Sequence, residues 1–206
     1  MNPIDGIRLV GSPANIPDSN RGMLPAFCAQ QGYEVGAEIG TYKGDFTALF
    51  CKEGLEMNAI DPWIAYAGGG RSQSKQDRQD FLYEHACRTL KPYHNCTIIR
   101  KPSMEALDMF KDGSLDFVFI DGDHSFPRIA EDIYCWSKKV RKGGLVSGHD
   151  YFNTWSEATN VLCHVEAIVD AYTKAFGITQ WWTFVRSKPL ELEDRSDKTL
   201  SWMWLK

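Results

Sequence analysis

Residues 34–44 read EVGAEIGTYKG, and this stretch decides the fold. A short apolar run ends in a glycine, and apolar residues then recur three and four positions apart, as they do on one face of a helix. The pattern predicts a strand over 34–40 and a helix over 41–53. Gly40 allows a sharp turn between them, and Gly44 lets the backbone come close to a ligand where the helix starts.

The same alternation of short apolar runs and longer amphipathic stretches continues along the chain, which favours β/α units and a mainly parallel sheet. The predicted strands cover residues 34–40, 57–60, 96–99, 115–120, 144–147, 181–186 and 201–205. The predicted helices after the first cover residues 76–90, 103–110, 126–140 and 157–176. The last two strands suggest a terminal antiparallel hairpin on the parallel sheet.

The composition fits one folded domain. The chain has 206 residues, 43% of them apolar, and a formal net charge of −4. Intrinsic disorder of the whole chain is therefore excluded, and the mildly acidic net charge argues against a nucleic-acid-binding protein. The absence of a long apolar segment and of a secretory leader predicts a soluble, cytoplasmic protein that does not bind membranes. The oligomeric state stays open.

Asp61 ends the second predicted strand, about twenty residues beyond the glycine turn. In open α/β sheets, ligands bind outside the carboxyl ends of the strands, and a carboxylate at this spacing can accept both hydroxyls of a ribose. The alternative is an aspartate that merely starts a turn before Pro62. The glycines have GxxxG spacing, which is neither the dinucleotide fingerprint nor a P-loop, and an ordinary strand-to-helix turn would explain them too.

Five segments follow one another in a recognisable order: EIGTYKG (38–44), AIDPW (59–63), IIRKPS (98–103), FVFIDGDHSF (117–126) and GGLVSGHDY (143–151). This order resembles the class I S-adenosylmethionine-dependent methyltransferases. Within them it is most similar to the metal-assisted O-methyltransferases that methylate sugars of the macrocin and mycinamicin type.

The resemblance implies a Rossmann-like three-layer sandwich with a seven-stranded, mainly parallel sheet and an antiparallel terminal strand. One domain would span residues 1–206, with an N-terminal lid or extension (1–30), a cofactor and metal core (34–151), and a C-terminal helix and hairpin (152–206). The implied S-adenosylmethionine-binding residues are Glu38, Gly40, Thr41, Gly44, Asp61, Pro62, Ser103 and Asp121. Asp61 would hold the ribose, Ser103 would lie near the adenine, and Asp121 near the point of methyl transfer.

A second group of polar residues follows the fourth and fifth predicted strands. Asp121, His149 and Asp150 offer oxygen, nitrogen and oxygen donors that suit a divalent cation such as Mg²⁺ or Mn²⁺. His124 stands three residues after Asp121, where the similar sugar methyltransferases carry their general base. A histidine with an ordinary pKa of about 6.5 can take a proton near neutral pH. Capping and loop hydrogen bonds are the alternative explanation.

These residues predict an O-methyltransferase that acts on a hydroxyl of a small molecule or saccharide, with a divalent metal and a histidine base. One alternative is a metal-independent methyltransferase acting on nitrogen or on nucleic acid. Another is a nucleotide-binding protein of this fold without catalysis. The acceptor should be chosen by segments outside the common core, namely residues 12–27, 63–74 and 151–157.

Overall fold

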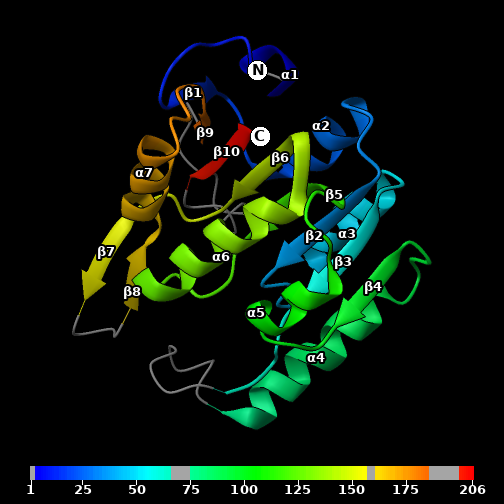
Figure 1. Cartoon of the computed structure of the whole chain (residues 1–206). Helices are drawn as coiled ribbons and strands as arrows, with labels where there is room; N and C mark the ends of the chain where they lie inside the picture. Colours follow the sequence, from blue (N-terminus) through cyan, green and yellow to red (C-terminus); the bar gives the residue numbers. More distant parts are fainter. Residues whose placement is uncertain (1–2, 66–74, 157–160, 186–199) are drawn as a thin grey trace.

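The computed structural model describes residues 3–65, 75–156, 161–185 and 200–206, and its centre is an eight-stranded sheet (Figure 1). The strands of this sheet are β1 (Ala14–Pro17), β2 (Val35–Ile39), β3 (Glu56–Ile60), β4 (Cys96–Ile99), β5 (Leu115–Ile120), β6 (Val140–Gly148), β9 (Trp182–Val185) and β10 (Ser201–Leu205). A separate two-stranded sheet is formed by β7 (Asn153–Ser156) and β8 (Val161–His164).

The helices in the described residues are α1 (Pro3–Gly6), α2 (Leu24–Gln30), α3 (Asp45–Lys52), α4 (Gln76–Leu90), α5 (Ser103–Ala106), α6 (Phe126–Lys139) and α7 (Val165–Ala175), with short 3-10 helices η1 (Arg21–Met23) and η2 (Leu107–Met109). Among these helices, none is long and apolar enough to cross a membrane.

The strand directions confirm the predicted mainly parallel sheet with an antiparallel terminal strand. The order across the large sheet is β1-β9-β10-β6-β5-β2-β3-β4. β10 runs antiparallel to both of its neighbours, β6 and β9, and the other neighbouring pairs are parallel. The last strand of the chain is thus inserted between two earlier ones.

The predicted count of seven strands is wrong by one, because β1 adds an eighth. Residues 14–17 pair in parallel with β9, so that Ala14 lies beside Trp182. This strand is four residues long, ends in Pro17 and lies at the sheet edge, where proline is tolerated. So short a segment carries too little alternation to stand out in the sequence.

The helix predicted over 157–176 is also wrong in its first part. Residues 161–164 form β8, which pairs antiparallel with β7, and α7 begins only at Val165. A short apolar run does not reveal by its period whether it is a strand or a helix. Residues 157–160 lie outside the described part of the chain, as do residues 66–74 of the expected acceptor loop.

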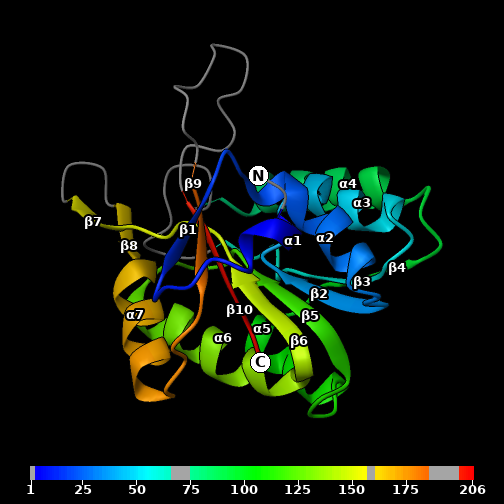
Figure 2. The ribbon, with the colours of Figure 1, turned by 90° about the horizontal axis from the view of Figure 1, so that it is seen from above.

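Helices cover both faces of the large sheet and make the predicted three layers (Figure 2). α5, α6 and α7 lie on one face, and α1 to α4 lie on the other. β5 shows how the core is divided: Phe117 and Phe119 pack into the cluster beside α2 and α3, while Val118 and Ile120 pack into the cluster beside α6 and α7. Because both faces are buried there, the last four residues of the strand read as one continuous apolar run.

The C-terminal tryptophans belong to this core. Trp181, Trp182, Trp202 and Trp204 are exposed by only 1%, 3%, 0% and 2%. Trp202 and Trp204 stack with ring centroids 5.0 Å apart, and Trp202 donates a hydrogen bond to the His149 carbonyl. Their burial makes these four tryptophans core residues rather than an open ligand cage.

Candidate active site

The carboxyl ends of four neighbouring strands bring the predicted residues to one edge of the sheet. In the strand register, Ile39 of β2 lies beside Ile60 of β3 and Ile120 of β5. β6 lies beside β5 on the other side. The residues that directly follow these strands are Gly40, Asp61, Asp121 and His149. The direction of the strand order reverses between β2 and β5, and such a switch point is where open α/β sheets bind ligands.

The glycine turn after β2 requires its glycines. Gly40 has φ +91°, and a Cβ there would collide with the backbone carbonyl of Asp121. Gly44 has φ +80° and caps α3, where a Cβ would lie 2.9 Å from Cγ of Leu90. A side chain at Gly40 would therefore separate the two strand ends that carry the predicted cofactor residues.

Thr41 supplies an unused polar atom inside this turn. The residue is 4% exposed, and its buried hydroxyl oxygen has no hydrogen-bond partner among the described residues. Buried polar atoms in folded proteins are nearly always paired, so such an orphan atom calls for a partner such as a ligand or an ordered water. The turn around Gly40 and Thr41 thus fits a polar cofactor.

Asp61 holds the loops after β2 and β3 together. Its carboxylate accepts the backbone N–H of Tyr42 at 2.9 Å and that of Trp63 at 2.8 Å, with Pro62 between Asp61 and Trp63. Burial raises the pKa of Asp61, and the two backbone hydrogen bonds oppose that shift. Each carboxylate oxygen can accept more than one hydrogen bond, so this turn-forming role is compatible with a ribose contact.

Glu38 is a buried acid at the end of β2. It is 2% exposed, and the Thr47 hydroxyl of α3 donates a hydrogen bond to it. Burial raises the pKa of Glu38 from its usual 4.5 to about 8, although the Thr47 hydrogen bond opposes the shift. Between about pH 4.5 and about pH 8, the Glu38 carboxyl is therefore protonated in the folded protein and ionised in the unfolded chain.

We expect Glu38→Gln to stabilise the protein at alkaline pH and to change little at pH 5. A raised carboxyl pKa contributes stability that is complete below about 4.5 and is lost as the pH rises towards about 8. At pH 9 the variant should melt higher than wild type by roughly 5 °C or more. Thermal unfolding at the two pH values measures this, with the exposed Glu105→Gln as a control that should follow wild type. Equal melting of Glu38→Gln and wild type at pH 9 would contradict the burial of a charge.

Ser103, predicted near the adenine, starts α5 and donates a short hydrogen bond to the carboxylate of Asp132 in α6. Asp132 is 4% exposed, and burial raises its pKa from 3.8 to about 7. The sequence interpretation missed Asp132. A signal was present, because Asp132 shares the buried face of α6 with Ile129 and Trp136, and a lone acid on an apolar helix face marks a paired or protonated carboxyl.

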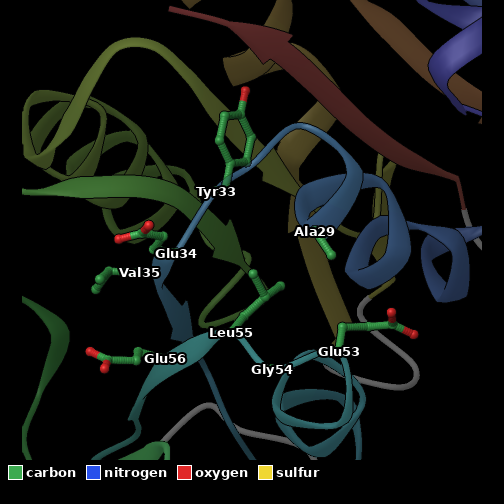
Figure 3. Close-up of a pocket in the computed structure, with 8 residues that line it drawn as sticks. All are labelled: Ala29, Tyr33, Glu34, Val35, Glu53, Gly54, Leu55 and Glu56. Atoms are coloured by element: carbon green, nitrogen blue, oxygen red, sulfur yellow. The ribbon is translucent and has the colours of Figure 1, made fainter.

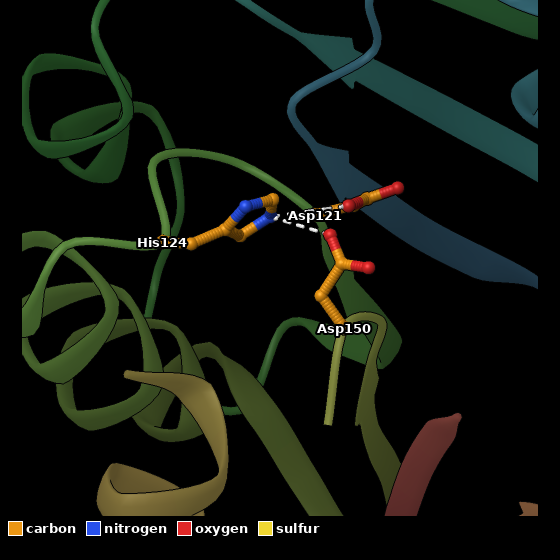
Figure 4. A group of neighbouring side chains, drawn as sticks. All are labelled: Asp121, His124 and Asp150. Carbon is orange, nitrogen blue, oxygen red and sulfur yellow. Dashed lines mark ion pairs between the residues drawn. The ribbon is translucent and has the colours of Figure 1, made fainter. Parts of the chain in front are cut away.

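Asp121, His124 and Asp150, which follow β5 and β6, form one compact acid–histidine group (Figure 4). His124 Nε2 lies 3.2 Å from Oδ2 of Asp150 and 3.4 Å from Oδ1 of Asp121. Ligand atoms of these three residues all lie within 4.8 Å of one another, close enough to hold one metal ion. Burial lowers the pKa of His124, but the two carboxylates outweigh it and the net pKa is raised above 6.5.

His149, the histidine predicted as a metal ligand, lies beside this group. Its Nδ1 is 3.2 Å from Oδ1 of Asp150 and 3.9 Å from Oδ1 of Asp121. Asp150 thus presents one oxygen to each histidine. The side chain of His149 is 7% exposed and that of His124 is 27% exposed, so His124 is the more accessible of the two.

Arg21 also enters the site, and the sequence interpretation missed it. Its guanidinium Nη1 lies 3.0 Å from Oδ2 of Asp121, and its Cζ lies 5.2 Å from the ring centre of Phe46 in α3. Arg21 lies in the 12–27 segment that was expected to border the site. Nothing in its local sequence pairs it with an aspartate one hundred residues away.

A separate hollow of about 360 Å³ lies at the opposite edge of the sheet, where β2 and β3 begin (Figure 3). The residues that line it are Ala29, Tyr33, Glu34, Val35, Glu53, Gly54, Leu55 and Glu56. It is separated from the strand-end residues by the length of β2 and takes no part in the site.

The fold and the strand-end residues define an α/β domain whose candidate site lies at a switch point of the sheet. Residues 37–151 match a family model described as a methyltransferase domain, and the chain belongs to this family. This match covers more than half of the chain and includes the glycine turn, Asp61 and the acid–histidine group. The predicted methyltransferase domain is therefore confirmed.

Solved structures share the fold. An O-methyltransferase from Bacillus cereus, in complex with SAH, matches with a TM-score of 0.60 at 14% identity, over 90% of this chain and 80% of that one. The O-methyltransferase TomG of tomaymycin synthesis from Streptomyces achromogenes, in complex with SAM, matches with a TM-score of 0.60 at 13% identity, over 90% and 79%. These likenesses confirm the predicted class I methyltransferase fold.

A relative in sequence is an uncharacterized protein of Acanthamoeba polyphaga mimivirus, 29% identical over 116 residues. The match covers 55% of this chain, and the chain spans half the length of this curated relative. The similarity to sugar-methylating enzymes stays a prediction.

Proposed function

We propose that this protein is an S-adenosylmethionine-dependent O-methyltransferase that acts on a hydroxyl of a small molecule or saccharide, assisted by a divalent metal. The observation that carries the proposal is the gathering of Asp121, His124 and Asp150 within 4.8 Å, at the ligand-binding edge of a methyltransferase domain. Binding of the cofactor alone would not require such a group.

The cofactor side of the proposal rests on the turn after β2. The backbone at Gly40 and Gly44, the orphan hydroxyl of Thr41 and the carboxylate of Asp61 would surround the methionine and ribose parts of S-adenosylmethionine. When bound, this cofactor supplies a methyl group on a positively charged sulfur, from which an oxygen nucleophile can remove it.

The metal side rests on Asp121, His149 and Asp150, whose oxygen and nitrogen donors suit Mg²⁺ or Mn²⁺. A bound divalent cation lowers the pKa of a hydroxyl that it coordinates, as it does for water, for which about 15.7 becomes about 7. Both histidines lie 3.2 Å from Asp150, and we assign the third ligand to His149 because it is the more buried of the two, at 7% exposure against 27%.

His124 is then the general base. It is the more exposed histidine, and the carboxylates of Asp121 and Asp150 stabilise the positive charge that it gains on taking a proton. In this division Asp121, His149 and Asp150 would hold the cation, and His124 would take the proton of the acceptor hydroxyl.

We expect methyl transfer from S-adenosylmethionine to depend on a divalent cation. Activity should be lost in EDTA and restored by excess Mn²⁺ or Mg²⁺, because without the cation the acceptor hydroxyl keeps its proton. The measurement is transfer of labelled methyl groups to panels of phenols, sugars and polyols. A rate that EDTA leaves unchanged would support a metal-independent enzyme acting on nitrogen or on nucleic acid instead. Cofactor binding with no acceptor methylated would support a non-catalytic binding protein.

A further inference from the structure

Arg21 is held firmly at the cofactor edge of the sheet by the segment that precedes it. Residues 14–17 pair with β9, and the Ser19 backbone N–H donates to the Val185 carbonyl at 3.2 Å. The Asn20 side chain then caps the 3-10 helix that carries Arg21 by accepting the Gly22 N–H at 2.9 Å. The guanidinium thus reaches the site from a segment anchored on both sides.

The charges around the glycine turn suit only part of the proposed cofactor. Asp61 and Asp121 are acids, which attract the sulfonium and the ammonium of S-adenosylmethionine. The cofactor's own carboxylate would be repelled by the same groups unless a cation stands beside it. Arg21 places such a cation between Asp121 and the ring of Phe46 in the first turn of α3.

The Arg21–Asp121 pair also leaves the proposed metal side of Asp121 in place. Arg21 contacts Oδ2 of Asp121, whereas Oδ1 is the oxygen near His124 and His149. One carboxylate therefore serves both sides of the site, with one oxygen towards the arginine and the other towards the acid–histidine group.

We propose that Arg21 binds the carboxylate at the methionine end of S-adenosylmethionine. This inference rests on the proposed function, since it needs that cofactor. A guanidinium recognises a carboxylate through two parallel hydrogen bonds, and it keeps its charge at every pH at which the protein is folded. Arg21 is thus a cofactor-binding residue, supplied by the N-terminal segment rather than by the strand-end loops.

The test compares two ligands by calorimetry. S-adenosylhomocysteine carries the amino-acid end, and 5′-methylthioadenosine has the same nucleoside and sulfur without it. Arg21→Gln should weaken binding of S-adenosylhomocysteine by about tenfold or more and leave binding of 5′-methylthioadenosine within about twofold of wild type. Arg21→Lys should recover part of the loss, because it keeps the charge but not the paired geometry.

Two matched variants separate a specific contact from general damage. Asp61→Asn should weaken both ligands, because both contain the ribose. Arg141→Gln removes another arginine that is ion-paired to an aspartate, but at the opposite edge of the sheet, since Arg141 Nε lies 2.6 Å from Oδ1 of Asp116 at the start of β5. It should change neither affinity.

The inference is wrong if Arg21→Gln weakens both ligands equally or neither. If wild-type protein binds neither ligand, the proposed function itself fails. The two failures are therefore distinguishable in one set of titrations, and no turnover is needed to read them.

Discussion

Replacing Asp150 with asparagine is expected to remove Mn²⁺ binding and to lower the rate of methyl transfer by roughly 1,000-fold. Asp150 offers one oxygen to each histidine, at 3.2 Å from His124 Nε2 and 3.2 Å from His149 Nδ1. Loss of its charge leaves a bound cation with a single carboxylate. Titration of Mn²⁺ by electron paramagnetic resonance and initial rates at saturating cofactor measure the two effects.

The choice of asparagine matters because Asp150 has φ +54°, in the left-handed region. Asparagine tolerates that backbone conformation and keeps the shape of the side chain, whereas alanine would add strain. The control is Asp112→Asn, which changes a 69% exposed aspartate paired with Lys139 and should behave as wild type. An Asp150→Asn variant that binds Mn²⁺ as wild type does would rule out the proposed metal site.

Replacing His124 with alanine is expected to lower turnover by about 100-fold to 10,000-fold, the usual contribution of a general base. The affinities for Mn²⁺ and for S-adenosylhomocysteine should stay near wild type, because His149 and the two aspartates would still hold the cation. Single-turnover rates report the proton-transfer step, and titrations report the two affinities. His94→Ala, an exposed histidine outside the site, serves as the control.

The same titrations decide between the two histidines. His124 is the imidazole that shares the tight group with Asp121 and Asp150. If His124→Ala loses Mn²⁺ affinity and His149→Ala keeps it, His124 is the ligand and the assignment of the base is reversed. Full activity of His124→Ala would exclude both roles.

Most of the sheet could be predicted because its strands are local patterns. β5 is apolar from Phe117 onward, and burial on both faces explains why none of Phe117, Val118 and Phe119 is polar. Two parts could not be predicted. These are β1 and the pair β7 and β8, whose strands are four residues long. Whether such a short segment becomes a strand depends on the partner with which it pairs, and its own sequence does not reveal that partner.

The site residues that directly follow strands could be predicted from the sequence. The site residues that lie on other elements could not. Asp61, Asp121 and His149 stand directly after strand ends, so the parallel sheet alone brings them to one edge. Arg21 and Asp132 come from other elements, η1 and the middle of α6. Their contacts with Asp121 and Ser103 appear only when the chain is folded.

Local sequence patterns were enough to predict the β/α order, the glycine turn at Gly40 and the acids at the strand ends, because each depends on periodicity or on the residue that follows a strand. Tertiary structure alone decided which side chains meet. It put one oxygen of Asp121 against Arg21 and the other beside His124, and it placed Asp150 between two histidines. Distances between residues far apart in the chain depend on how strands and helices pack, and no local pattern encodes them.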